Sequence, residues 1–208
     1  APVVTITMTV IGQGQDEGML TRSGAVPGDL VAVTGYLGSA AAGLRMLSRG
    51  LSLAPETADL LKKAYLQPQP RVAQGQLLVK GGVRAAIDIS DGLLADLGHL
   101  CQASKVGATI TVDRVPVHPV MRGAFPEEAL DLALAGGEDY ELLFTADKKK
   151  MTKVKEALET SPVGAECPVA IIGEVTEAQG VSLLTGDGRP FSVDRAGWDH
   201  FKKGGIAH

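Results

Sequence analysis

The chain has 208 residues, of which 45% are hydrophobic and 21% are charged, and its formal net charge is −4. The negative charge and an aromatic content of only 4% argue against nucleic-acid binding, which needs a surplus of Lys and Arg and aromatic rings for stacking. No apolar run reaches the roughly 20 residues that a membrane-spanning helix requires. The two cysteines, Cys101 and Cys167, show neither disulfide nor metal-ligand spacing, which predicts a cytoplasmic protein.

The first element expected along the chain is a strand. Residues 3–11 (VVTITMTVI) carry Thr at every second position, and alternation of this kind is typical of strands. Residues 22–28 (RSGAVPG) are rich in turn-forming types. We therefore expect a domain boundary near residue 24, with residues 1–24 and 25–208 in different units.

The second unit alternates between strand and helix patterns, which predicts an α/β or α+β fold with a mixed sheet and packed helices. Leu93, Leu97, Leu100 and Cys101 form one apolar helix face. We expect strands at residues 29–34, 85–89, 108–112, 140–145, 168–175 and 181–185. We expect helices from about residues 39 and 55, and at residues 72–81, 92–104, 126–134 and 148–160.

An acidic segment lies where a predicted strand meets a predicted helix. It reads Asp88-Ile89-Ser90-Asp91-Gly92. Ser and Asp are common helix caps, so Ser90 or Asp91 capping the next helix is one interpretation. Capping does not explain Asp88 at the end of an apolar strand, because a desolvated carboxylate needs a partner or a metal ion. Asp88 and Asp91 together form a hard-oxygen pair suited to Mg²⁺, and the two interpretations are compatible.

Three other motifs are weaker by themselves. In Gly136-Gly137-Glu138-Asp139-Tyr140-Glu141, a glycine pair precedes acids, which indicates either a tight turn or a close approach of backbone to a ligand. The Gly35-x-x-Gly38-x-x-x-x-Gly43 segment lacks the ending of a P-loop, and its small residues 40–43 lead us to expect close helix packing instead. Trp198, the only tryptophan, fits a cap over the core and a ligand-stacking role equally well.

Taken together, these segments resemble the thiamine-monophosphate kinase family, which belongs to the superfamily that also holds aminoimidazole ribonucleotide synthetase. The resemblance rests on LTRSGAVPGDLVAVTG, LGSAAAGL, PQPRVAQG, AIDISDGLLADLGHL, LALAGGEDYELLFT and GWDHF, in this order. It implies the carboxy-terminal synthetase-like domain for residues 25–208. Residues 1–24 would then be the last strand and linker of an amino-terminal ATP-binding domain, through which the intact protein would form a homodimer.

The resemblance also implies roles for six residues. Asp88 and Asp91 would bind Mg²⁺, and Ser90 and Arg22 would contact ATP. Glu138 and Trp198 would contact the substrate, thiamine monophosphate. A tryptophan face suits a cationic ring through cation–π attraction.

The implied reaction is Mg²⁺-assisted, in-line transfer of a phosphoryl group from ATP to thiamine monophosphate, which forms thiamine diphosphate. A phosphate monoester is mostly ionised at neutral pH, since its second pKa is roughly 6, so no catalytic base is expected. Two alternatives stay open. One is a sister ATP-dependent enzyme of the same superfamily with another substrate, and the other is that this chain by itself is a non-catalytic fragment.

Overall fold

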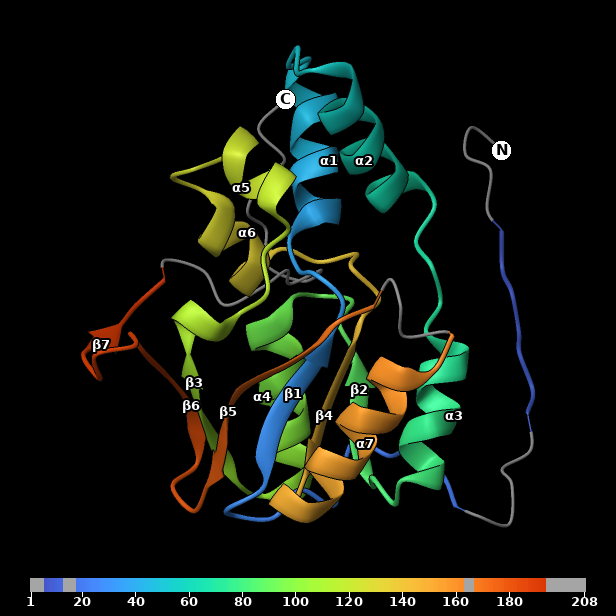
Figure 1. Cartoon of the computed structure of the whole chain (residues 1–208), viewed down its shortest axis with the longest axis vertical. Coiled ribbons are helices and arrows are strands. Elements are labelled where there is room, and N and C mark those ends of the chain that lie inside the picture. The colour runs from blue at the N-terminus through green and yellow to red at the C-terminus, as the bar shows by residue number, and fades with distance from the viewer. Residues whose placement is uncertain (1–5, 13–17, 163–166, 194–208) are drawn as a thin grey trace.

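The computed structural model of the chain describes residues 6–12, 18–162 and 167–193 (Figure 1). Its strands form one seven-stranded sheet in the order β2-β4-β1-β5-β3-β6-β7. Neighbouring strands are antiparallel except β3 and β6, which are parallel. The strands are β1 Leu30–Thr34, β2 Ala85–Asp88, β3 Gly107–Thr111, β4 Leu142–Ala146, β5 Val169–Thr176, β6 Gly180–Leu184 and β7 Pro190–Phe191.

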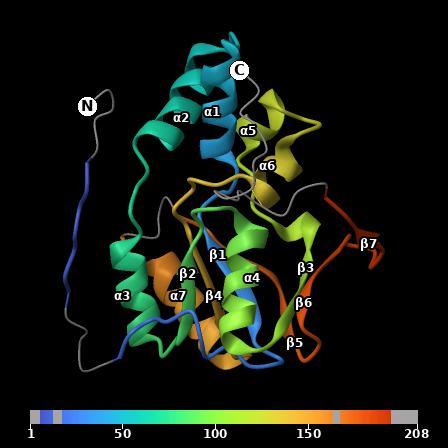
Figure 2. The same cartoon turned by 180° about the vertical axis from the view of Figure 1, so that it is seen from behind.

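Helices cover both faces of this sheet and one of its ends. Helix α4 lies on one face and α3 and α7 on the other, while α1, α2, α5 and α6 gather at the end drawn at the top (Figures 1 and 2). The helices are α1 Ser39–Arg49, α2 Pro55–Leu66, α3 Val72–Lys80, α4 Leu93–Ser104, α5 Pro119–Ala124, α6 Ala129–Ala135 and α7 Lys148–Thr160, with a short 3-10 helix at Val112–Arg114.

Alternation along the central strand explains the two covered faces. Val31 and Val33 of β1 pack in the cluster that contains the buried leucines of α4. Ala32, which points the other way, packs in a second cluster with residues of α3 and α7. Since both faces are apolar, β1 reads as a continuous apolar run, and the sheet is buried on both sides.

Most expected elements are confirmed within one or two residues, and α7 matches its expected bounds. The expected helix at 126–134 is wrong at its start, because α6 begins at Ala129 and a separate helix, α5, ends before Phe125-Pro126. A proline lacks the amide hydrogen and disfavours a helical residue before it. The sequence interpretation missed α5 and β7.

The expected strand at residues 3–11 is not confirmed where it is described. Residues 6–12 form no strand, and Ile6, Met8, Val10 and Ile11 are between 84% and 92% exposed. A strand forms only where another strand satisfies its backbone, and none lies beside these described residues. Thr21, by contrast, forms a parallel bridge with Ala85. The boundary near residue 24 stays a prediction.

No helix in the described part of the chain has the length and apolarity needed to cross a membrane.

Candidate nucleotide and metal site

The acidic segment forms the turn between β2 and α4. Asp88 is the last residue of β2, and its side chain is exposed. Ile89, the next residue, is completely buried and packs in the core. Ser90 and Asp91 are half-buried. Gly92 is the N-cap residue of α4, with a φ of 120° and no side-chain cap. The interpretation that Ser90 or Asp91 caps this helix is therefore wrong.

A residue that the sequence interpretation missed takes over the capping role. Asp96, in the first turn of α4, is only 2% exposed. Its Oδ2 accepts hydrogen bonds from the amides of Ser90, Asp91 and Gly92, at 2.9, 3.0 and 3.2 Å. One buried oxygen thus fixes three consecutive amides of the turn, and the signal for it in the sequence was an acid in an otherwise apolar helix face.

The glycine-rich segment at residues 136–141 packs directly against this turn. The amide of Glu138 donates to the carbonyl of Ser90 at 2.9 Å, and that of Tyr140 donates to Ile89 at 2.9 Å. A Cβ at Gly137 would lie 2.4 Å from the Ser90 carbonyl oxygen. Glycine is therefore required there by a close backbone approach, but the backbone it meets is the acidic turn. Tertiary structure thus joins two motifs about 48 residues apart.

This junction gathers acidic side chains around one phenol. Tyr140 donates a hydrogen bond through its hydroxyl to Oε2 of Glu138, at 3.2 Å. Desolvation raises the pKa of Tyr140, and the charges of Glu138, Asp88 and Asp91 raise it further. These three carboxylates therefore lie close enough to act on the same group. Glu138 and Tyr140 both have positive φ, 72° and 51°, a strained conformation that often marks functional sites.

The donors of this cluster fit a divalent metal ion of the magnesium type. Asp88 is exposed and Asp91 half-exposed, and carboxylate oxygens are the ligands that Mg²⁺ prefers. Ligand atoms of Asp91, Asp96 and His99 also lie within 4.8 Å of one another, although Oδ2 of Asp96 already accepts three amides of the turn. The sequence interpretation found no metal-binding pattern among the histidines, because His99 joins this group only through the helical spacing of α4.

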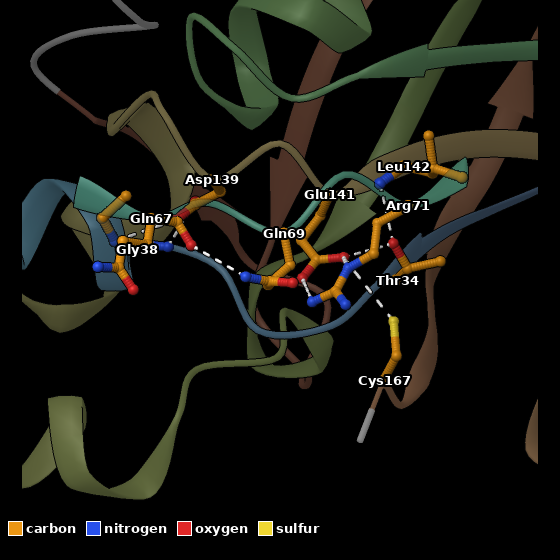
Figure 3. A network of polar contacts seen from close by, with 10 residues as sticks. Thr34, Gly38, Gln67, Gln69, Arg71, Asp139, Glu141, Leu142 and Cys167 are labelled. Atoms are coloured by element: carbon orange, nitrogen blue, oxygen red, sulfur yellow. Dashed lines mark hydrogen bonds and ion pairs between the residues drawn. The ribbon is translucent and has the colours of Figure 1, made fainter. Parts of the chain in front are cut away.

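On its other side, residues 136–141 are anchored by a polar network (Figure 3). Glu141, 4% exposed, forms a two-point ion pair with Arg71, with contacts of 2.8 and 2.6 Å. Thr34 donates to the same carboxylate at 2.7 Å and accepts from the amide of Leu142 at 2.8 Å. The network joins the end of β1, the connection before α3 and the start of β4.

Asp139 is the second anchor in this network (Figure 3). Its carboxylate accepts from the amides of Gly38 and Ala40, at 2.7 and 3.2 Å, and so caps α1. Desolvation raises its pKa to about 7, although the two amide donors act in the opposite direction. Gly38 has a φ of 85° and no room for a Cβ beside Ala133. The expected structural role of the Gly35–Gly38 segment is thus confirmed.

Asp139 and Glu141 also line a cavity of about 310 Å³. Its other walls come from α2 and from the segments that precede α1, α3 and α5, including Tyr36, Lys63 and His118. The side chains of this network are therefore accessible from a hollow that does not include Asp88 or Glu138.

Among the described residues, the predicted site residue Arg22 does not lie at the acidic turn. Arg22 is exposed, and its carbonyl accepts a hydrogen bond from Ser104, the last residue of α4. The acidic turn precedes the first residue of that helix, so the backbone of Arg22 lies at the opposite end. Trp198 falls outside the described residues. The roles of both remain predictions.

Comparison with known proteins agrees with the fold. The sequence profile of the AIR synthase related protein, C-terminal domain, matches residues 26–185. The chain belongs to this family. This match confirms the expected synthetase-like fold.

Individual relatives of this AIR synthase related domain carry names that are more specific than the name of the family. The thiamine-monophosphate kinase of Escherichia coli O157:H7 is 43% identical over 185 residues, which are 88% of this chain and 55% of that protein. The solved structure of AaThiL complexed with AMPPCP and TMP has a TM-score of 0.71 and 33% identity, covering 88% of this chain and 54% of that one. The hydrogenase maturation protein HypE of E. coli has a TM-score of 0.68 and 26% identity, covering 85% and 52%. The chain therefore spans about half the length of these relatives.

Proposed function

We propose that this chain forms the carboxy-terminal part of an enzyme that transfers the γ-phosphoryl group of ATP to thiamine monophosphate. The observation that carries the proposal is the junction of the acidic turn with residues 136–141, where the amides of Glu138 and Tyr140 donate to the turn and the charges of Asp88, Asp91 and Glu138 all act on Tyr140. The kinase relative at 43% identity supports the substrate, and the relative complexed with AMPPCP and TMP supports a nucleotide and a second ligand.

Within this proposal the residues of the turn have separate tasks. Asp88 and Asp91 hold Mg²⁺, and Ser90, between them, contacts the nucleotide. Mg²⁺ supplies positive charge that neutralises the phosphates. Arg22 adds a fixed positive charge toward ATP; because its backbone lies at the other end of α4, a second copy of the protein would have to supply it. Glu138 and Trp198 contact the thiamine moiety.

The chemistry needs positioning more than proton transfer. The acceptor is a phosphate oxygen that is mostly ionised at neutral pH, because its second pKa is roughly 6. In-line transfer then depends on bringing two polyanions together and on neutralising their charge. A turn whose amides at residues 90–92 and whose carbonyls at Ile89 and Ser90 are engaged is suited to this task, because its carboxylates do not have to be ordered when the ligands arrive.

Three further features belong to the same proposal. The whole protein forms a homodimer, residues 1–24 belong to its amino-terminal ATP-binding domain, and it works in the cytoplasm. Cys101 and Cys167, both buried free thiols, agree with a reducing compartment. The fold by itself does not distinguish this kinase from a sister enzyme, since the HypE structure has nearly the same TM-score.

Titration calorimetry of the 208-residue chain with Mg–ATP, and then with thiamine monophosphate, tests the proposal. We expect Mg–ATP to bind and Asp88→Asn to weaken it at least tenfold, since a metal ligand is lost. Asp59→Asn, on the exposed face of α2, is the matched control and should bind like the wild type. In the whole protein, Asp88→Asn should lower kcat on the order of 100-fold.

Equal Mg–ATP binding by the Asp88→Asn variant and the wild type would contradict the metal assignment. Binding of Mg–ATP but turnover of another phosphate acceptor in a substrate panel would favour the sister enzyme. Heat from neither ligand would favour a non-catalytic fragment.

A further inference from the structure

The strongest unexplained feature outside the proposed ligand set is the burial of Asp96. A carboxylate with 2% exposure is costly to desolvate unless it is well paired. Within the described part of the chain its partners are the three amides of residues 90–92, and no salt bridge involves it. Hydrogen bonds to an ionised acceptor are roughly twice as strong as neutral ones, so these contacts offset the burial and fix the turn.

Ordinary helix stabilisation does not explain this geometry. An acid in the first turn is favourable to any helix because of the helix dipole, and Glu56 of α2 is such an acid with an exposed side chain. Asp96 differs because it is buried and bonds to amides that precede the helix. The three amides belong to Ser90, Asp91 and Gly92, two of which carry side chains of the proposed nucleotide and metal site.

We propose that Asp96 is a positioning residue. It holds the Ser90–Gly92 turn in one conformation, so that Asp91 and Ser90 already face the Mg–ATP site before the ligand binds. This rests on the proposed function for the identity of the ligand. The packing from the other side agrees with it: the carbonyls of Ile89 and Ser90 accept from Tyr140 and Glu138. The amide side of the turn is held by Asp96 and the carbonyl side by residues 136–141.

Two measurements on Asp96→Asn in the 208-residue chain test the inference. Asn keeps the size and one acceptor oxygen but loses the charge, so the fold is retained while the three contacts weaken. We expect amide hydrogen exchange at residues 90–92 to accelerate at least tenfold, with exchange in β1 changed less than threefold. We expect the dissociation constant of Mg–ATP to rise about 10-fold to 100-fold, as for other groups that orient metal ligands. Asp96→Ala should show both effects more strongly.

Two controls separate positioning from other roles. Asp91→Asn removes the proposed ligand but not the amide contacts, so it should weaken Mg–ATP binding and leave exchange at residues 90–92 nearly unchanged. Glu56→Gln removes a first-turn acid elsewhere and should change neither measurement.

Unchanged exchange at residues 90–92 in both Asp96 variants would overturn the inference. So would faster exchange with Mg–ATP affinity within twofold of the wild type, since Asp96 would then be structural only. If the wild-type chain does not bind Mg–ATP, the proposed function fails together with the metal half of this inference. The exchange measurement would still decide whether Asp96 holds the turn.

Discussion

The carboxylates in and around the acidic turn and residues 136–141 fall into two groups with opposite environments. Asp88 and Glu138 are exposed beside Tyr140, where they are available to a ligand. Asp96 and Glu141 are buried, and Asp139 is largely desolvated, and all three accept hydrogen bonds from the chain itself. In the proposed function the first group contacts the ligands, while the second group holds the backbone that carries it. Residue type alone does not separate them.

The pKa of Asp139 leads to a prediction about stability. Its folded value of about 7 lies above the ordinary 3.8, so the folded state binds this proton more tightly than the unfolded state. The contribution is fully present below about pH 4 and is lost as the pH rises toward 7. The free energy of unfolding should therefore fall over this interval, with a slope of at most about 1.4 kcal/mol per pH unit from this group.

Asp139→Asn should remove that slope. Urea denaturation of both proteins between pH 4 and 8 measures it as the difference in unfolding free energy, so that the other titrating groups cancel. The wild type should lose stability relative to the variant as the pH rises. Parallel curves of unfolding free energy against pH for the two proteins would show that the pKa of Asp139 is not raised.

At the scale of elements, the site is a contact between two connections of the sheet. β2 ends and β4 begins at the same end of the sheet, because the two strands are antiparallel and Asp88 pairs with Leu142. The segments beyond these ends continue the contact through Glu138 and Tyr140. The backbones approach closely at Gly137, where no side chain fits.

Gly137→Ala should disrupt this contact. Its Cβ would lie 2.4 Å from the Ser90 carbonyl oxygen, so the backbone has to shift, at a cost of about 1–3 kcal/mol. Mg–ATP binding should weaken as well, since the shift moves Ser90. The matched control is Gly98→Ala in α4, whose Cβ meets nothing within 4 Å, and which should be neutral or stabilising by up to about 1 kcal/mol. Equal stability of both variants in urea would contradict the close approach.

At the scale of the molecule, one ion pair joins parts that are distant in the sequence. Arg71 follows α2 and precedes α3, yet it pairs with Glu141 at the start of β4, 70 residues later. Thr34 at the end of β1 shares the same carboxylate. The helices at one end of the sheet and the strands of its centre are therefore connected through one buried group (Figure 3).

Arg71→Met should destabilise the whole domain by about 2–4 kcal/mol, because it leaves the Glu141 carboxylate buried without its cation. The side chain of Arg71 keeps 20% exposure, which places the effect toward the lower part of that range. Arg189→Met, in an exposed pair with Asp187, is the control and should cost less than about 1 kcal/mol. The two free energies of unfolding in urea give the comparison, and a similar loss in both would refute the role of the buried pair.

Local pattern was sufficient for most elements of the fold. Neighbouring residues alone indicate the apolar run of β1, the strand-to-helix change at residues 88–92 and the amphipathic face of α7. Hydrophobic periodicity detects such features directly. The acidic composition of residues 88–91 was also sufficient to mark Asp88 and Asp91 as candidate ligands. Residues 6–12 show the limit, because a strand pattern forms no strand without a neighbouring chain.

What the sequence by itself determined was the identity of the elements and the residue types at their ends. Only the tertiary structure decided that β1 lies between β4 and β5, that Asp96 is buried and that residues 136–141 meet the acidic turn. The physical reason is that these contacts are hydrogen bonds and burial between segments far apart in the chain. The local sequence around a residue does not predict which distant segment of the backbone will donate hydrogen bonds to it.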